Sequence, residues 1–104
     1  MGKNAVIKSI GIVIARISVH KIVLKKGNRP EAKKHLEDEI RDYSTDIFEA
    51  ANSYSWTKDE SAKIKEKAIR FARNLSKKYI DINFTQADID EAVIDTMQEL
   101  MIIK

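Results

Sequence analysis

The stretch NAVIKSIGIVIARISVHKIVLKK, residues 4–26, decides the fold, because Ile and Val are concentrated in it. When it is read as a helix at 100° per residue, its apolar side chains form two stripes. One stripe contains Val6, Ile7, Ile10, Val13, Ile14, Ile17 and Leu24, and the stripe on the far side contains Ile12, Val19, Ile22 and Val23. A helix that is apolar on two sides is normally buried on two sides. We therefore expect either the central helix of a bundle or a helix shared with a second subunit.

The same stretch also has features of a strand. Its apolar residues are mostly β-branched, which favours strands. Ile10, Ile12 and Ile14 alternate, and Gly11 or residues 18–20 mark a possible bend. Periodicity alone does not separate a buried strand from a buried helix. An α+β fold, with an N-terminal two-stranded ribbon before three helices, therefore stays open as the alternative.

Capping signals predict three further helices. A Ser, Thr, Asp or Asn followed three residues later by an acid marks a helix start, and three such pairs stand just before amphipathic stretches: Asn28 with Glu31, Thr57 with Glu60, and Thr85 with Asp88. Gly27 is suited to end the preceding helix in the left-handed conformation. The third helix is expected over residues 58–79.

The helix expected after Asn28 has the clearest periodicity. Its apolar positions follow spacings of three and four residues, as in a helical bundle, and are Leu36, Ile40, Tyr43, Ile47, Ala50 and Tyr54. Short links between amphipathic helices imply antiparallel neighbours. The chain has no Gly or Pro after Pro30, so no flexible linker is indicated there. We predict one domain over residues 1–104, an all-α small antiparallel bundle of about four helices.

Composition limits the class of protein. The 104 residues are 43% hydrophobic and 34% charged, as in a soluble globular domain, and the chain is near the size at which association adds needed burial. Without cysteine, neither a disulfide framework nor a thiolate metal site is available. Lys8, Arg16 and Lys21 interrupt the apolar N-terminal stretch before it reaches membrane-spanning length. We expect a cytoplasmic protein that makes no membrane contact.

Charge alternates in blocks along the chain. Residues 1–35 contain nine basic residues and one acidic residue, and residues 36–60 contain two and eight. Residues 61–80 then contain seven and one, and residues 81–104 contain one and six. This alternation favours side-by-side packing of successive helices, although each exposed ion pair adds only about 0–1 kcal/mol.

The two-sided N-terminal helix predicts self-association as the main function. We expect a non-enzymatic helical interaction module that forms a homo-oligomer, helped by the apolar tail at residues 101–103. The predicted interface residues are Ile12, Val19, Ile22, Val23 and Trp56. Trp56 lies at a predicted turn, where it either plugs one end of the bundle or anchors a protein interface.

The two basic blocks, residues 1–35 and 61–80, support an alternative function. Together they suit a surface that binds the phosphate backbone of DNA or RNA without reading its sequence. The residues that would make these contacts are Lys21, Lys25, Lys26, Arg29, Lys33, Lys34, Lys63, Lys67, Arg70, Arg73, Lys77 and Lys78.

A weaker alternative is a ribonuclease. Arg29 and His35, which have five residues between them at a helix start, resemble the Arg and His motif of the HEPN superfamily of small helical dimers, which includes metal-independent ribonucleases. The resemblance implies that His35 acts as acid or base and that Arg29 stabilises charge on the phosphate. His35 with the carboxylates around it is also a possible divalent metal site, although such spacing is typical of a charged helix face. We predict no cofactor, no metal and no other catalytic residue.

Overall fold

The computed structural model describes residues 3–27 and 30–103, and these ranges form four helices and no strand. They are α1 (Lys3–Lys26), α2 (Pro30–Asn52), α3 (Lys58–Ser76) and α4 (Gln86–Glu99). The all-α prediction is therefore confirmed, and the N-terminal ribbon is not needed. None of these helices is long and apolar enough to span a membrane.

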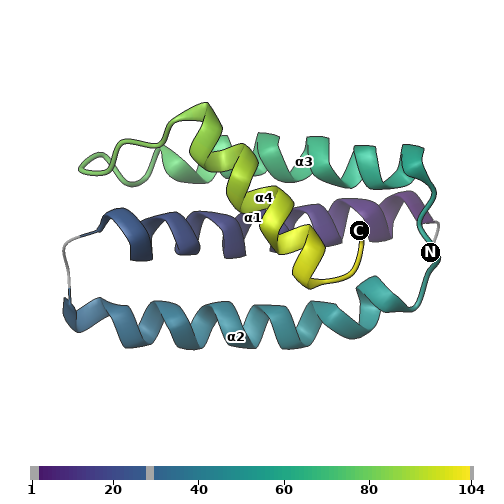
Figure 1. Cartoon of the computed structure of the whole chain (residues 1–104), viewed down its shortest axis with the longest axis horizontal. Helices are drawn as coiled ribbons and strands as arrows, with labels where there is room; N and C mark the ends of the chain where they lie inside the picture. Colours follow the sequence, from purple (N-terminus) through teal and green to yellow (C-terminus); the bar gives the residue numbers. More distant parts are fainter. Residues whose placement is uncertain (1–2, 28–29, 104) are drawn as a thin grey trace.

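Helix α1 is the centre of the molecule. It packs against all three other helices, with α2 and α3 on either side and α4 crossing it obliquely (Figure 1). Its buried side chains come from both apolar stripes and include Ile10, Ile14 and Ile17 from the first and Val19 and Ile22 from the second. Burial on several sides explains how a segment rich in β-branched residues is stable as a helix, because packing outweighs propensity.

The order of packing differs from a regular up-and-down bundle. Helices α2 and α3 follow each other in the chain, but their backbones do not come into contact, and α1 is the one helix on which α2 packs closely (Figure 1). The most extensive helix pair is α1 with α3, although both are basic. Apolar burial therefore decides this pairing, and charge alternation does not.

Gly11 allows α1 and α3 to approach closely. A Cβ atom at this position would lie 3.1 Å from Cβ of Lys67 and 3.5 Å from the backbone nitrogen of Ala68. Both contacts are with α3, so a larger side chain at residue 11 would push the two helices apart.

The predicted starts of α3 and α4 are confirmed. Thr57 and Thr85 are the N-caps of these helices, and each forms a complete capping box with Glu60 and Asp88. The N-cap pair expected from Asn28 lies outside the described residues. Helix α3 ends at Ser76, three residues earlier than predicted.

The prediction of a left-handed Gly27 is wrong, because this residue does not have a positive φ. The amide of Gly27 donates a hydrogen bond to the carbonyl oxygen of Val23 at 2.6 Å. A Cβ atom at residue 27 would lie 2.4 Å from that oxygen. A glycine therefore suits this helix end for lack of space, and not for its freedom to adopt a left-handed conformation.

Helix α4 ends in a Schellman turn that places the C-terminal tail in the core. Met101 has a φ of 61°, its amide donates to Gln98, and the amide of Ile102 donates to Met97 at 2.9 Å. Ile102 is buried as a result, whereas Met101 is exposed. Of the tail residues expected to dock on a partner, Ile102 instead packs within its own chain.

Candidate interaction surface

Helix α4 covers one side of α1 and leaves the opposite side open. Ser18 and Lys21 of α1 face α4, where Nζ of Lys21 donates hydrogen bonds to Oγ1 of Thr96 at 3.0 Å and to Oε1 of Glu99 at 2.8 Å. Positions two residues from Ser18 are about 200° away around a helix. Arg16 and His20 therefore lie on the opposite side of α1.

This opposite side is the floor of a trough between α2 and α3. The trough has a volume of about 240 Å³ and is lined by residues of three helices: Arg16, Val19, His20, Glu39, Tyr43, Leu75, Lys78 and Tyr79. Ile12 lies four residues before Arg16, and Val23 lies three after His20, so both share this side of α1. We call the surface formed by Ile12, Arg16, His20 and Val23 the open side of α1.

Of the five predicted interface residues, two prove unavailable. Val19 and Ile22 are only 1% and 5% exposed and belong to the core of their own chain. Their prediction as interface residues is corrected on this ground, because α3 and α4 cover much of the second stripe. Ile12 and Val23 are half-buried and stay accessible on the open side.

Trp56 closes the end of the bundle. Its indole nitrogen donates to the carbonyl oxygen of Ala51 at 2.7 Å, and its ring contacts the core. The ammonium group of Lys3 lies 5.3 Å from the Trp56 ring centroid and bonds Oε2 of Glu60 at 2.9 Å. These contacts tie the start of α1 to the link between α2 and α3, which favours the structural role of Trp56 over the interface role.

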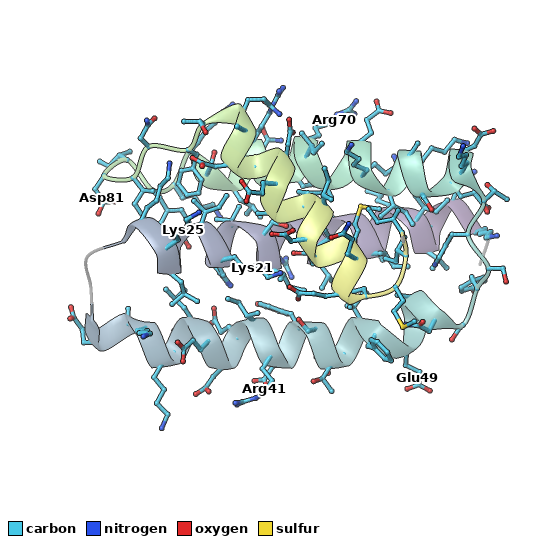
Figure 2. All side chains as sticks on the ribbon, viewed as in Figure 1. Lys21, Lys25, Arg41, Glu49, Arg70 and Asp81 are labelled. Atoms are coloured by element: carbon cyan, nitrogen blue, oxygen red, sulfur yellow. The ribbon has the colours of Figure 1, made fainter. Side chains whose placement is uncertain are left out.

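Several cations of the first basic block have acidic partners within the chain. Lys21 pairs with Glu99, and Lys26 pairs with Asp88 and also bonds the carbonyl oxygen of Asn83 at 2.7 Å. Lys25 lines a hollow beside the acidic residues of α4. Figure 2 shows Lys21 and Lys25 on the C-terminal half of α1. Acidic side chains of α4 therefore offset much of this charge.

The rest of the first block is dispersed on α2. Lys33 lies 4.0 Å from Glu37, and Lys34 is exposed nearby. Arg29 lies outside the described residues. Among the described residues, the structure therefore brings none of the predicted contact residues of the first block into one surface with those of the second.

The second basic block forms a more concentrated surface. A groove of about 580 Å³ between α3 and the start of α1 is lined by Lys63, Lys67 and Arg70 together with Lys8. Glu66 is the one carboxylate in its lining, 3.7 Å from Arg70. Lys8 was not among the predicted contact residues, because its place in the first apolar stretch hides its position beside α3.

Three further cations of this block point to different places. Lys78 lines the trough at the open side, and Lys77 is exposed close to it. Arg73 is directed to α4, where its guanidinium group donates to the side chain of Gln86. Figure 2 shows Arg70 on α3.

His20 is a half-buried imidazole at the contact of α1 with α2. Burial lowers its pKa below 6.5, the nearby His35 and Arg16 lower it further, and Glu39 opposes this shift. Oε2 of Glu39 lies 3.5 Å from Nδ1 of His20, which makes no hydrogen bond within the described residues. The ion-pair distance is too long for a strong contact, so His20 is mainly neutral at pH 7.

The predicted ribonuclease pair is only half visible, because Arg29 lies outside the described residues. His35 is 72% exposed, and its Nε2 lies 3.0 Å from Oε1 of Glu39. Within residues 3–27 and 30–103, no group of three or more His, Asp or Glu side chains is placed to hold a metal ion.

The fold and the surface define a small all-α bundle with an open side on its central helix. Comparison of the chain with protein-family models, with curated proteins and with solved structures gives no match. The proposals below therefore depend on the geometry of the described residues alone.

Proposed function

We propose that this protein is a small, non-enzymatic helical assembly module that self-associates through the open side of α1. The observation that carries the proposal is the gap between α2 and α3. The backbones of these helices are not in contact, so a trough stays open over α1 between them. Ile12 and Val23 are left half-buried there, and burial of such side chains against a partner would be favourable.

The size of this face supports a protein partner. The molecule extends over 39 × 25 Å in the plane of Figure 1, and the open side belongs to the face opposite α4. A typical stable interface buries about 800 Å² on each partner. An outline of 39 × 25 Å is little larger than this area, so a partner must cover most of the face to bind stably.

The test is the molar mass of the protein over a range of concentrations, measured by light scattering and sedimentation equilibrium. We expect reversible dimerisation, and we expect Ile12→Asp to abolish it by placing a charge in the buried contact. Ile80→Asp is the matched control, because Ile80 is 95% exposed on the link between α3 and α4. A wild-type protein that stays monomeric at every concentration, or dimers lost only in Ile80→Asp, would contradict the proposal.

The groove at Lys8, Lys63, Lys67 and Arg70 favours a second candidate, sequence-independent binding of a nucleic-acid backbone. Four cations around one groove with a single carboxylate suit contacts to phosphates. The groove borders the open side, so a nucleic acid and a second copy of the chain would compete for the basic side chains of α3.

Fluorescence anisotropy of labelled duplex DNA tests this candidate. We expect binding at low salt that weakens steeply as salt rises, and we expect Lys67→Glu with Arg70→Glu to remove it. Lys33→Glu with Lys34→Glu is the control, since these exposed lysines lie on α2, away from the groove. Equal loss of binding in both double variants would point to net charge alone and would count against the groove.

A further inference from the structure

Two rows of opposite charge border the open side of α1. On α2, spacings of three and four residues place Asp42 and Asp46 on the same side as Glu39, which lines the trough. The corresponding row contains Lys63, Lys67 and Arg70 on α3 and Lys78 just after the end of α3, and each of these residues lines the trough or the groove at the start of α1. The face is therefore acidic along one edge and basic along the other.

These two rows do not neutralise each other within one chain. Helix α1 lies between α2 and α3, and the backbones of the two outer helices are not in contact. A face with an acidic edge, a partly apolar centre and a basic edge is complementary to a rotated copy of itself. Closed dimers use such self-complementary patches.

We infer that the partner at the open side is a second copy of this chain, related by a two-fold axis parallel to α1. This rotation places α2 of each copy over α3 of the other, so that each acidic row meets a basic row. A two-fold axis in the same plane but perpendicular to α1 would instead place α2 over α2 and α3 over α3. Like charges would then oppose each other, so charge selects the first arrangement.

The register of the two rows fits this arrangement. Glu39 of α2 and Leu75 of α3 line the same trough and thus lie at about one level along α1. Helices α2 and α3 run in opposite directions (Figure 1). Seven residues along α2 lead from Glu39 to Asp46, a rise of roughly 10 Å, and five residues back along α3 lead from Leu75 to Arg70, a rise of roughly 8 Å. Because rotation about an axis parallel to α1 preserves this level, Asp46 meets Arg70 of the second copy.

Arg16 is the cation in the middle of the open side. In the dimer its guanidinium group lies near its counterpart across the axis, so it needs carboxylates around it. Glu39 shares the trough with Arg16, and Asp42 of the second copy approaches from the opposite edge. The acidic row therefore has two roles, to meet the basic row and to offset Arg16.

The inference rests on the proposed self-association and is tested by charge reversal. The acidic-row variant carries Asp42→Lys and Asp46→Lys, and the basic-row variant carries Lys67→Glu and Arg70→Glu. We expect each alone to weaken self-association by about tenfold or more, because like charges then face each other. The control, Glu37→Lys with Glu91→Lys, makes the same charge change at exposed positions outside both rows and should dimerise as the wild type does.

Mixing the two variants gives the decisive result. An equimolar mixture should form heterodimers, and a chain that carries all four changes should self-associate again. Because the backbones of α2 and α3 are not in contact within one chain, such rescue requires contact between two copies. A mixture that stays monomeric while the wild type dimerises would overturn the arrangement but leave the proposed function standing. Wild-type protein that never dimerises would overturn both.

Cross-linking distinguishes the two symmetries directly, since the chain contains no cysteine of its own. Asp46→Cys and Arg70→Cys, mixed as single variants and oxidised, should give a disulfide-linked heterodimer, whereas each variant alone should stay unlinked. Efficient self-linking of Asp46→Cys would show α2 packed on α2 and would overturn the inference. Circular dichroism of every variant verifies that the helices are intact.

Discussion

His20 lies between α1 and α2, where burial lowers its pKa below 6.5. The unfolded chain therefore binds a proton at this residue more readily than the folded chain does. The free energy of unfolding must therefore fall as the pH decreases through 6.5 toward the lower pKa of His20 in the folded protein. Below that folded pKa, both states bind the proton, and the effect of His20 on stability no longer changes with pH. We expect His20→Gln to make the loss of stability between pH 7 and pH 5 shallower, measured as the free energy of unfolding by urea at each pH.

His35 provides the control for this prediction. Its side chain is largely exposed and lies near the same carboxylate, that of Glu39, as His20 does. His35→Gln removes a titratable imidazole without removing a buried one, so the pH dependence of stability should change little. If His35→Gln flattened the profile and His20→Gln did not, the cause assigned to His20 would be wrong.

Gly11 sets the distance between α1 and α3. In an isolated helix, replacing glycine would be favourable by up to about 1 kcal/mol, but overpacking of a close helix contact costs about 1–3 kcal/mol. The atom that a new Cβ would meet, Cβ of Lys67, is next to the backbone and cannot rotate away. We therefore expect Gly11→Val to lower the free energy of unfolding by roughly 1–3 kcal/mol.

The matched control for Gly11→Val is Ala5→Val, which introduces the same side chain at an exposed position of α1. Urea denaturation followed by circular dichroism compares the two variants. A loss of similar size in both would assign the effect to the helix propensity of valine and not to the contact with α3.

At the scale of a whole element, the capping box at the start of α4 has a predicted effect on stability. The Thr85 side chain accepts a hydrogen bond from the amide of Asp88 at 3.1 Å. Its loss in Thr85→Ala should destabilise the protein by about 0.5–2 kcal/mol. Thr45→Ala, at an exposed position within α2, is the control and should be nearly neutral. Equal effects in thermal unfolding would contradict a capping role.

Low pH should also destabilise the start of α4. A hydrogen bond from Lys26, followed by those from Thr85, lowers the pKa of Asp88 from 3.8 to about 2. Stability from these contacts is fully present above pH 3.8 and is lost as the pH falls toward 2, because the unfolded chain is protonated first. Lys26 thus joins the end of α1 to the start of α4.

Element boundaries could be predicted wherever the signal is local. The capping boxes at Thr57 and Thr85 were found from residues three positions apart, because the hydrogen bonds that define them join those residues. The end of α3 was placed too late. Tyr79 continues the apolar spacing of α3, but it packs against Phe84, with ring centroids 6.0 Å apart, in the link to α4.

At the scale of the whole molecule, α2 is the least covered helix. Helix α1 is the one helix on which it packs closely, and only Ile47 and Ala51 are buried among its described side chains. We expect its backbone amides to exchange with deuterium faster than those of the buried part of α1, because local opening costs less where few contacts are lost. Mass spectrometry of deuterated peptides measures this at low protein concentration, and equal protection of α1 and α2 would contradict it.

The candidate site was predicted only in part. Both apolar stripes of residues 4–26 are real, but the sequence did not reveal which residues of the second stripe stay accessible. Val19 and Ile22 are covered within the chain, whereas Ile12 and Val23 lie on the open side. The sequence also did not reveal which cations are paired. Lys21 and Lys26 were predicted to contact phosphates, but α4 places Glu99 beside Lys21 and Asp88 beside Lys26.

The sequence by itself determined the four helices, their caps and the central place of residues 4–26, because these follow from periodicity and from hydrogen bonds between residues close in the chain. Only the tertiary structure decided which helices are neighbours, which cations are neutralised and which side of α1 stays open. These properties depend on contacts between residues far apart in the chain. Opposite charges and apolar stripes permit several pairings of such helices, and close packing, as at Gly11 against α3, selects one of them.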